Sequence, residues 1–270
     1  MNRIRPQILL FTYHKSGTTL FNYVFRKLAD RLGLSMTGLY GMTREIDPTI
    51  DIVLTGHSLL GCEPLPPFRA VRAVRDPRDI WVSGYLYHLR TREPWCVNTD
   101  FDPTPPIVYP RVDFSFQHWP ERWKRSWLAR LDSRSYQQNL LDRDRDAGLA
   151  FELEGYTGCT LTAMRGWRSR GPEVLDVQLE EIERDFDGMM ERVFRHLGLT
   201  EAECAMALDI AASEDISRMD DATLAANGHI HSRRLAKWRD VLSPAQIRMF
   251  ERRYGDLITG LGYQLSDPSP

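Results

Sequence analysis

The chain has 270 residues, 42% of them hydrophobic, which is enough to bury a substantial core. Its formal net charge of −2 at pH 7 argues against nucleic acid and membrane surfaces as partners, so any basic site must be local. The four cysteines are scattered without metal-ligand spacing, and no apolar run reaches the ~20 residues of a membrane span. We therefore expect a cytoplasmic protein with no structural metal and no membrane span, forming one domain over residues 1–270.

A polar loop follows the first predicted strand. The apolar run Ile8–Phe11 predicts the strand, and a helical pattern with Leu20, Val24 and Leu28 on one face begins soon after it. Between them lies the loop His14-Lys15-Ser16-Gly17-Thr18-Thr19. Such a loop directs backbone N–H groups and the positive end of the helix dipole at one point. The lysine and the hydroxyl groups add further donors, so the stretch predicts a phosphate-type ligand.

Three further strands are expected along the chain. Ile52–Leu54 is followed by His57, Phe68–Val74 is followed by Arg75, and Glu173–Gln178 forms the last strand. A helix is expected to begin at Pro77 and to continue through Ile80, Trp81, Val82 and Tyr85. Further helices are expected around residues 121–130 and over residues 139–154, 161–170, 180–197 and 201–212. Strands that alternate with helices predict an α/β fold with a central parallel sheet. In open parallel sheets ligands bind at the carboxyl ends of the strands, where His57 and Arg75 are placed.

A nucleoside-triphosphate P-loop, G-x-x-x-x-G-K-[ST], is the first alternative for the polar loop. The residue order argues against it, because Lys15 precedes Gly17 instead of following it. A kinase also needs an acidic residue at a strand end to hold magnesium, whereas His57 and Arg75 follow the two inner strands. A basic site without a carboxylate suits metal-free transfer of an already activated anionic group. A P-loop small-molecule kinase remains the alternative function.

Two segments resemble the sulfotransferases that use 3′-phosphoadenosine 5′-phosphosulfate (PAPS). Thr12-Tyr-His-Lys-Ser-Gly-Thr-Thr-Leu20 is similar to the family's 5′-phosphosulfate loop, T-Y-P-K-S-G-T-T-W. Arg75-Asp-Pro-Arg-Asp-Ile-Trp-Val-Ser83 is similar to its 3′-phosphate motif, an arginine, an N/D-P-x-D turn and a serine. Residues 173–199 and 233–262 carry further similarity. The resemblance implies a three-layer α/β/α, P-loop NTPase-like fold, with PAPS as donor, adenosine 3′,5′-bisphosphate as product and no metal.

The resemblance also implies roles for individual residues. Lys15 and His57 are the expected catalytic residues: Lys15 stabilises the charge on the leaving phosphate, and His57 takes the proton of the attacking hydroxyl. His88 and His118 are weaker candidates for that base. The expected cofactor-binding residues are His14, Lys15, Ser16, Gly17, Thr18, Thr19 and Leu20 at the 5′ end, and Arg75, Ser83 and one or both of Arg233 and Arg234 at the 3′-phosphate.

Four single positions and one segment depart from the pattern of the family. In the segment, Arg233-Arg234-Leu-Ala-Lys237 replaces a glycine-rich R-K-G-x-x-G. His14 replaces a proline, Leu20 replaces the tryptophan that stacks on adenine, Thr55 replaces a second lysine, and Leu179 replaces a tyrosine. A non-catalytic nucleotide-binding protein of the same fold is therefore a further alternative.

Residues 90–170 carry no motif of the family and are expected to form an insertion that shapes the acceptor pocket. The expected acceptor is a small molecule or glycan that attacks through a hydroxyl or, less favoured, an amine. Aromatic residues in and before this segment are candidates to line the pocket, namely Tyr85, Tyr87, Trp95, Phe114 and Phe116. Trp119, Trp123 and Trp127 recur every four residues, which is typical of a packing stripe on a helix.

Overall fold

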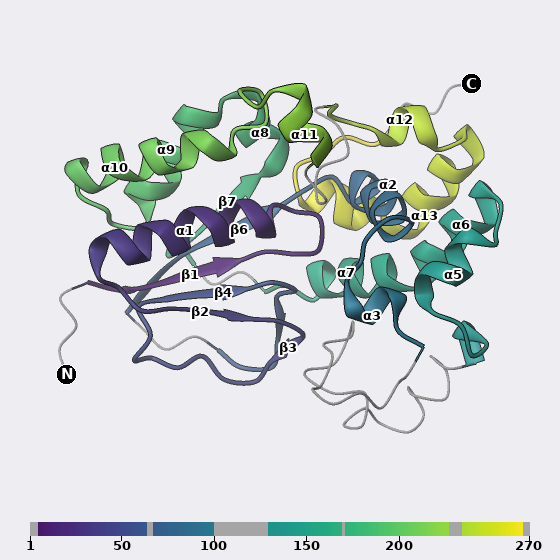
Figure 1. Ribbon diagram of the computed structural model, residues 1–270, viewed down its shortest axis with the longest axis horizontal. Coiled ribbons are helices and arrows are strands. Elements are labelled where there is room, and N and C mark those ends of the chain that lie inside the picture. Colours follow the sequence, from purple (N-terminus) through teal and green to yellow (C-terminus); the bar gives the residue numbers. More distant parts are fainter. Residues whose placement is uncertain (1–4, 64–66, 100–128, 169–170, 227–233, 267–270) are drawn as a thin grey trace. The chain divides into compact units, whose positions relative to one another are not determined.

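The computed structural model describes residues 5–63, 67–99, 129–168, 171–226 and 234–266 (Figure 1). The chain divides into two compact units, each built from two segments. The first unit comprises residues 1–75 and 166–233, and the second comprises residues 76–165 and 234–270. A single functional domain over residues 1–270 stays a prediction, as does the acceptor-shaping role of residues 90–170. The predicted tryptophan stripe, Phe114 and Phe116 lie outside the described residues.

A five-stranded parallel sheet forms the centre of the first unit, in the order β2-β4-β1-β6-β7. Its strands are β1 (Gln7–Phe11), β2 (Met36–Leu39), β4 (Ile52–Thr55), β6 (Phe68–Val74) and β7 (Val174–Gln178). A separate parallel pair consists of β3 (Met42–Thr43) and β5 (Leu59–Leu60). The predicted α/β class with a central parallel sheet is confirmed, and so are the four strands expected from the sequence. β2, β3 and β5 are additional to them.

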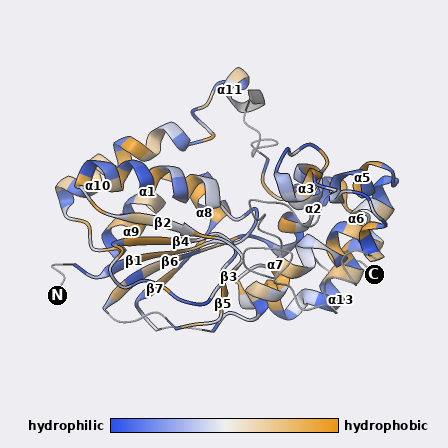
Figure 2. Cartoon of the chain, turned by 60° about the horizontal axis from the view of Figure 1, so that its bottom comes forward, coloured by the Kyte–Doolittle hydropathy of each residue, from blue (hydrophilic) through white to orange (hydrophobic). Residues whose placement is uncertain are grey.

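The central strand β1 alternates its side chains between two hydrophobic layers. It pairs with β4 on one side and with β6 on the other. Ile8 and Leu10 belong to one layer, while Leu9 and Phe11 belong to the other, as the two-residue period of a strand requires. All five residues of β1 are buried, and Figure 2 shows the hydrophobic colours on the central strands. The sheet core therefore positions the loop that leaves β1.

Helices of the first unit pack on the face of the sheet that contains Ile8 and Leu10 (Figure 1). These helices are α1 (Thr18–Leu32), α8 (Leu179–Arg184), α9 (Phe186–His196) and α10 (Glu201–Ala211). The short 3-10 helix η2 (Ala212–Glu214) and α11 (Asp221–Ala226) follow α10 along the chain. The single helix expected over residues 180–197 is two helices. The chain breaks at Asp185, whose carboxylate caps α9 by accepting a hydrogen bond from Gly188 N.

Trp167 packs against the other face of the sheet, together with the segment that carries β3 and β5. Its ring meets that of Phe11 edge-on at 4.9 Å between centroids, and the guanidinium of Arg72 lies 4.9 Å from it. The sequence pattern places Trp167 in a helix over residues 161–170, but that helix ends at Arg165. Trp167 is thus a core residue of the sheet instead of a helical one.

The second unit is helical in its described residues. Its helices are α2 (Pro77–His88), α3 (Pro94–Val97), α5 (Tyr136–Leu141), α6 (Arg145–Glu154), α7 (Tyr156–Arg165), α12 (Trp238–Val241) and α13 (Pro244–Gly260). α2 begins as predicted, with Asp76 accepting from Arg78 N and Pro77 at the first helical position. The helix expected over residues 139–154 is two helices, because Asp144 caps a new helix at Arg145.

Arg78 ties together the two chain segments of the second unit. Its guanidinium donates to Asp76 at 2.8 Å, to Glu251 of α13 at 2.6 Å and to the Gln264 carbonyl at 2.8 Å. It also lies 3.9 Å from the centroid of the Trp238 ring. In the part of the chain described above, no helix is both long and apolar enough to span a membrane.

Candidate functional site

The loop between β1 and α1 depends on two residues in the left-handed region. Lys15 has φ of +63° and Gly17 has φ of +96°. Glycine adopts such angles without steric cost, whereas a residue with a Cβ at position 17 is strained. A Cβ on Gly17 would also lie 3.3 Å from Leu179 Cδ1. The backbone conformation at position 17 therefore favours the predicted glycine, and a larger residue there would also require Leu179 to shift by a few tenths of an ångström.

Ser16 shapes the loop from inside. Its hydroxyl accepts from Tyr13 N at 2.7 Å and donates to Tyr13 O at 2.9 Å, and Ser16 N also donates to Tyr13 O at 3.0 Å. Ser16 has no exposed surface. The sequence assigns its hydroxyl to the ligand, whereas the geometry assigns it to the backbone of the loop.

Thr18 and Thr12 connect the loop to the neighbouring strand β4. Thr18 Oγ1 lies 2.8 Å from Thr12 Oγ1 and donates to Tyr13 O at 3.1 Å. Thr12 Oγ1 donates to Thr55 O at 3.2 Å. The hydroxyls of the loop that are nearest the sheet therefore contribute to its shape, while Thr19 is exposed.

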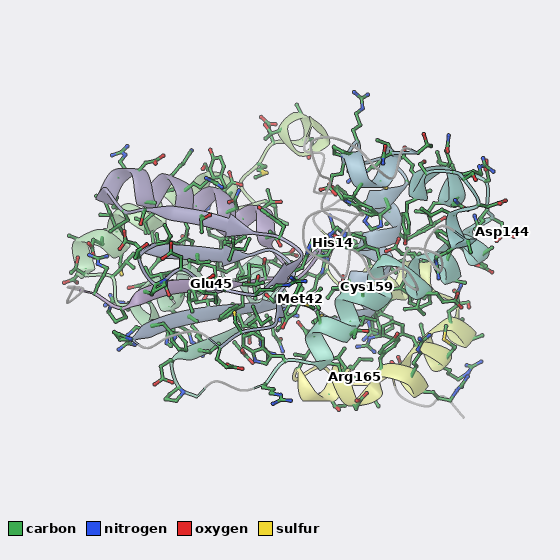
Figure 3. All side chains as sticks on the ribbon, turned by 90° about the horizontal axis from the view of Figure 1, so that it is seen from below. His14, Met42, Glu45, Asp144, Cys159 and Arg165 are labelled. Carbon is green, nitrogen blue, oxygen red and sulfur yellow. The ribbon has the colours of Figure 1, made fainter. Side chains whose placement is uncertain are left out.

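The first turn of α1 presents backbone donors. The first hydrogen bond inside the helix runs from Phe21 N to Gly17 O at 3.1 Å, and Gly17 provides no side-chain cap. The N–H groups of Thr18, Thr19 and Leu20 precede that bond and have no acceptor within the helix. They lie at the positive end of the dipole of a 15-residue helix. Together with Lys15 and the half-buried His14 (Figure 3), they are the candidate anion-binding groups of the loop.

Arg75 is held against this loop by two contacts. Its Nη1 donates to the main-chain oxygen of Lys15 at 3.2 Å, and its Nε lies 4.0 Å from Glu180 Oε1. Both side chains of the ion pair are 7% exposed. Sequence reasoning missed Glu180 and described the site as lacking a carboxylate, which is wrong on this point. The sequence carries one signal for such a partner, because Arg75 directly follows a buried strand. A guanidinium buried at that place needs an anionic partner.

His57 is anchored by its Nδ1 atom. The N–H of Gly41 donates to His57 Nδ1 at 2.9 Å, and the ring of Tyr40 meets the imidazole edge-on at 6.2 Å. His57 is half-buried just after β4, as the sequence predicts. Beside it, Ser58 donates to Thr12 O at 2.7 Å and lies 3.0 Å from Thr55 Oγ1. Thr55, which stands where the family has a second lysine, is thus a buried hydroxyl of the strand end.

The structure describes two of the other residues that are predicted to bind the cofactor, Ser83 and Arg234. Ser83 is buried on α2 of the second unit. Arg234 belongs to the same unit, is exposed, and forms a 2.9 Å ion pair with Asp240. Arg233 and His118 lie outside the described residues. The roles of Ser83, Arg233 and Arg234 stay predictions.

His88, the weaker candidate for the base, lies in a closed polar cluster of the second unit. Its Nδ1 is 2.7 Å from Glu152 Oε2, to which Tyr136 OH also donates at 3.0 Å. His88, Glu152 and Tyr136 are all 0% exposed. Burial raises the pKa of Tyr136 and of the neighbouring Tyr156 well above the usual value for tyrosine. His88 therefore fits a core position better than a base that meets substrate.

The aromatic residues proposed for the acceptor pocket are buried where they are described. Tyr85 is 6% exposed, Tyr87 is 4% exposed and Trp95 is 7% exposed. Tyr87 OH donates to Glu93 Oε1 at 2.9 Å, and the Trp95 ring lies 5.0 Å from that of His88. These contacts are typical of a packed aromatic core.

Among the described residues there is no group of three or more His, Cys, Asp or Glu side chains placed to hold a metal ion. No family model matches the chain, and no curated protein matches it. Among solved structures, the chain is similar to a crystal structure of mouse sulfotransferase SULT7A1 complexed with PAP. The two share 15% identity with a TM-score of 0.47, over 96% of this chain and 86% of the mouse chain.

Proposed function

We propose that the protein is a cytoplasmic sulfotransferase that moves a sulfonate group from PAPS to a hydroxyl, or less readily an amine, of a small molecule or glycan. The observation that carries the proposal is the hydrogen bond from Arg75 Nη1 to the main-chain oxygen of Lys15. It joins Lys15 of one motif to Arg75, the first residue of another motif that is far away in the sequence. One motif would hold the 5′-phosphosulfate and the other would hold the 3′-phosphate.

Lys15 and the first turn of α1 supply the charge that the reaction needs. In an in-line transfer, a bond forms between the acceptor oxygen and sulfur while the bond from sulfur to the 5′-phosphate oxygen breaks. The electron pair of the broken bond stays on the phosphate, which gains negative charge. A lysine ammonium and helix N-terminal N–H groups stabilise such a developing anion without a metal.

Arg75 would distinguish PAPS from ATP, because only PAPS carries a 3′-phosphate. A guanidinium binds phosphate in a planar, charge-assisted geometry, and Glu180 together with the Lys15 carbonyl fixes its orientation. We propose that Ser83 and one or both of Arg233 and Arg234 also bind the 3′-phosphate.

Two alternative functions differ in how well the residues of the loop and of β4 support them. A P-loop small-molecule kinase is disfavoured by the order of Lys15 and Gly17. A non-catalytic nucleotide-binding protein of the same fold is favoured by Thr55, because its hydroxyl is buried beside Ser58 and replaces a positive charge of the family's site.

Calorimetry separates the nucleotides. We expect adenosine 3′,5′-bisphosphate to bind to the full chain without metal and ATP with magnesium to bind much more weakly. Binding of ATP with magnesium, but not of the bisphosphate, would refute the sulfotransferase proposal. Release of bisphosphate from PAPS in the presence of an acceptor panel then distinguishes the enzyme from a non-catalytic binder.

A further inference from the structure

Lys15 has a backbone conformation that is uncommon for lysine. Its φ of +63° lies in the left-handed region, where the Cβ of any residue other than glycine is crowded. Such a conformation persists only where the surrounding structure holds it, and it is concentrated at functional sites. The groups that hold the main chain of Lys15 therefore bear on the position of the ammonium that the proposed reaction uses.

The peptide unit between Lys15 and Ser16 is held at both of its polar atoms. On one side, Ser16 N donates to Tyr13 O at 3.0 Å, inside the loop. On the other side, Arg75 Nη1 donates to Lys15 O at 3.2 Å, from outside the loop. Because a peptide unit is planar, hydrogen bonds at its N–H and its C=O together orient the whole plane. The Cα of Lys15 belongs to that plane, so the direction in which its side chain leaves the loop is restrained as well.

The sheet brings Arg75 to this peptide unit. β1 and β6 are parallel neighbours in which Phe11 is aligned with Arg72. Lys15 comes four residues after Phe11 and Arg75 three residues after Arg72, so both follow the same edge of the sheet. The guanidinium of Arg75 is in turn placed by Glu180, whose Oε1 lies 4.0 Å from Nε, and both side chains are 7% exposed. Moving the guanidinium would separate two buried charges, so the pair gives it a defined position.

One arginine can hold the loop and a ligand at the same time. A guanidinium carries several N–H groups in a rigid plane, so a bond to a main-chain oxygen does not prevent another N–H from donating to a phosphate. In the proposed function Arg75 binds the 3′-phosphate of the donor. Its bond to Lys15 O adds a contact to the loop that would hold the 5′-phosphosulfate.

We infer that Arg75 is also a positioning residue for Lys15, so that sulfonate transfer depends on Arg75 beyond the binding of the 3′-phosphate, an inference that rests on the proposed sulfotransferase function. The bond to Lys15 O maintains the left-handed conformation of the loop. It thereby keeps the ammonium where the 5′-phosphate gains negative charge as its bond to sulfur breaks. The side chain that recognises the 3′ end of the donor thus also prepares the loop for its 5′ end.

Nuclear magnetic resonance tests this restraint without any turnover. Arg75→Met removes the donor to Lys15 O, and it is combined with Glu180→Gln so that no buried charge is left without its partner, a double change that is often neutral for stability. The unmodified chain and Glu180→Gln, which both keep the donor, are the references. In the nucleotide-free ¹⁵N-labelled full chain, we expect the order parameter of the Ser16 amide to fall from about 0.85 in the references to about 0.6 or lower in the double variant. An unchanged order parameter would overturn the inference, whatever reaction the protein catalyses.

Turnover at saturating PAPS separates positioning from binding. We expect Arg75→Met with Glu180→Gln to lower kcat about 10- to 100-fold relative to Glu180→Gln, because a reacting group displaced by about 1 Å loses activity on this scale. When Lys15→Ala is also present, the same change should lower kcat less than about 2-fold, since Arg75 then has no ammonium to position. A rise in KM with unchanged kcat, or an equal loss of kcat with and without Lys15→Ala, contradicts the inference.

Arg69 offers a matched control on the same strand. It is exposed, and its Nη1 also donates to a main-chain oxygen, that of His196, at 3.0 Å. We expect Arg69→Met to leave both kcat and the order parameter of the Ser16 amide unchanged, and losses as large as those of the Arg75 variant would overturn the inference. Absence of PAPS turnover in the unmodified protein would instead refute the proposed function, and the order parameter would still decide whether Arg75 holds the loop.

Discussion

Arg75 and Glu180 form an ion pair in which Nε and Oε1 are 4.0 Å apart and each side chain is only 7% exposed. Glu180→Gln keeps the shape of the side chain and removes its charge. We expect the free energy of unfolding to fall by about 3 kcal/mol, because a buried guanidinium loses its compensating charge. Urea denaturation measures the change, with Glu181→Gln on the same helix as a half-exposed control. A Glu180→Gln protein as stable as the unmodified chain would show that the pair does not stabilise the fold.

Ser16→Ala separates a structural hydroxyl from a ligand-binding one. The buried hydroxyl bonds to both the N–H and the carbonyl of Tyr13, so its removal leaves Tyr13 N without this acceptor. We expect a loss of about 1–3 kcal/mol in the free energy of unfolding. Thr19→Ala, at an exposed position of the same loop, is the control and should change stability by less than about 0.5 kcal/mol. Weaker bisphosphate binding by Ser16→Ala at unchanged stability would instead assign the hydroxyl to the ligand.

Gly17→Ala tests whether the loop conformation is required for binding. The new Cβ is strained at φ of +96° and lies 3.3 Å from Leu179 Cδ1, so the N–H groups at the start of α1 must shift. We expect affinity for adenosine 3′,5′-bisphosphate to fall at least about 10-fold, or about 1.4 kcal/mol. Gly33→Ala is a close control, because Gly33 also has positive φ, at the other end of α1, but its Cβ would meet nothing within 4 Å. Gly33→Ala should lower the free energy of unfolding and leave the affinity for the bisphosphate, measured by calorimetry, unchanged. Equal affinity of Gly17→Ala and Gly33→Ala for the bisphosphate would exclude the loop as the binding element.

The four strands that were predicted correctly are recognisable without tertiary information. β1 and β4 contain continuous apolar runs bounded by polar or turn-forming residues, whereas β6 and β7 are interrupted by charged residues but remain rich in valine. β2 was missed because its four residues include Gly38 and are only half-buried, so the run carries neither a β-rich composition nor a clear alternation. The helix break at Asp185 was missed because the apolar spacing continues across it and the cap depends on local backbone geometry.

The parts of the site that consist of consecutive residues could be predicted from the sequence. The loop around Lys15 and the arginine after β6 were found from consecutive residues, and the structure brings these two into hydrogen-bond contact. The groups that contact Arg75 and His57 are not their neighbours in the sequence. Glu180 meets Arg75 only because β7 lies beside β6, and Gly41 meets His57 through a backbone N–H, which has no side-chain signature.

Lys15→Ala tests the charge proposed to stabilise the leaving phosphate. We expect kcat for PAPS turnover to fall by about 100- to 1000-fold, since this charge matters most when the phosphate becomes more negative. The binding of bisphosphate should weaken far less, because the N–H groups of α1 and Arg75 remain. Lys27→Ala, which removes an exposed lysine on α1, is the matched control and should keep full activity. If Lys15→Ala retained normal turnover, the catalytic assignment of the loop would be wrong.

The buried tyrosines of the second unit predict a loss of stability in alkali. Burial raises the pKa of Tyr136 and Tyr156 well above the value of about 10 that they regain on unfolding. Above that pH the unfolded chain releases their protons while the folded chain retains them, so rising pH favours unfolding. We expect the free energy of unfolding from urea denaturation to fall as pH rises above about 10. Tyr136→Phe removes one of the two groups, so its stability should fall less steeply with pH although its stability at neutral pH is lower, because Tyr156 N loses its acceptor. Tyrosinate absorbance at these positions in the folded protein near pH 10 would contradict the prediction.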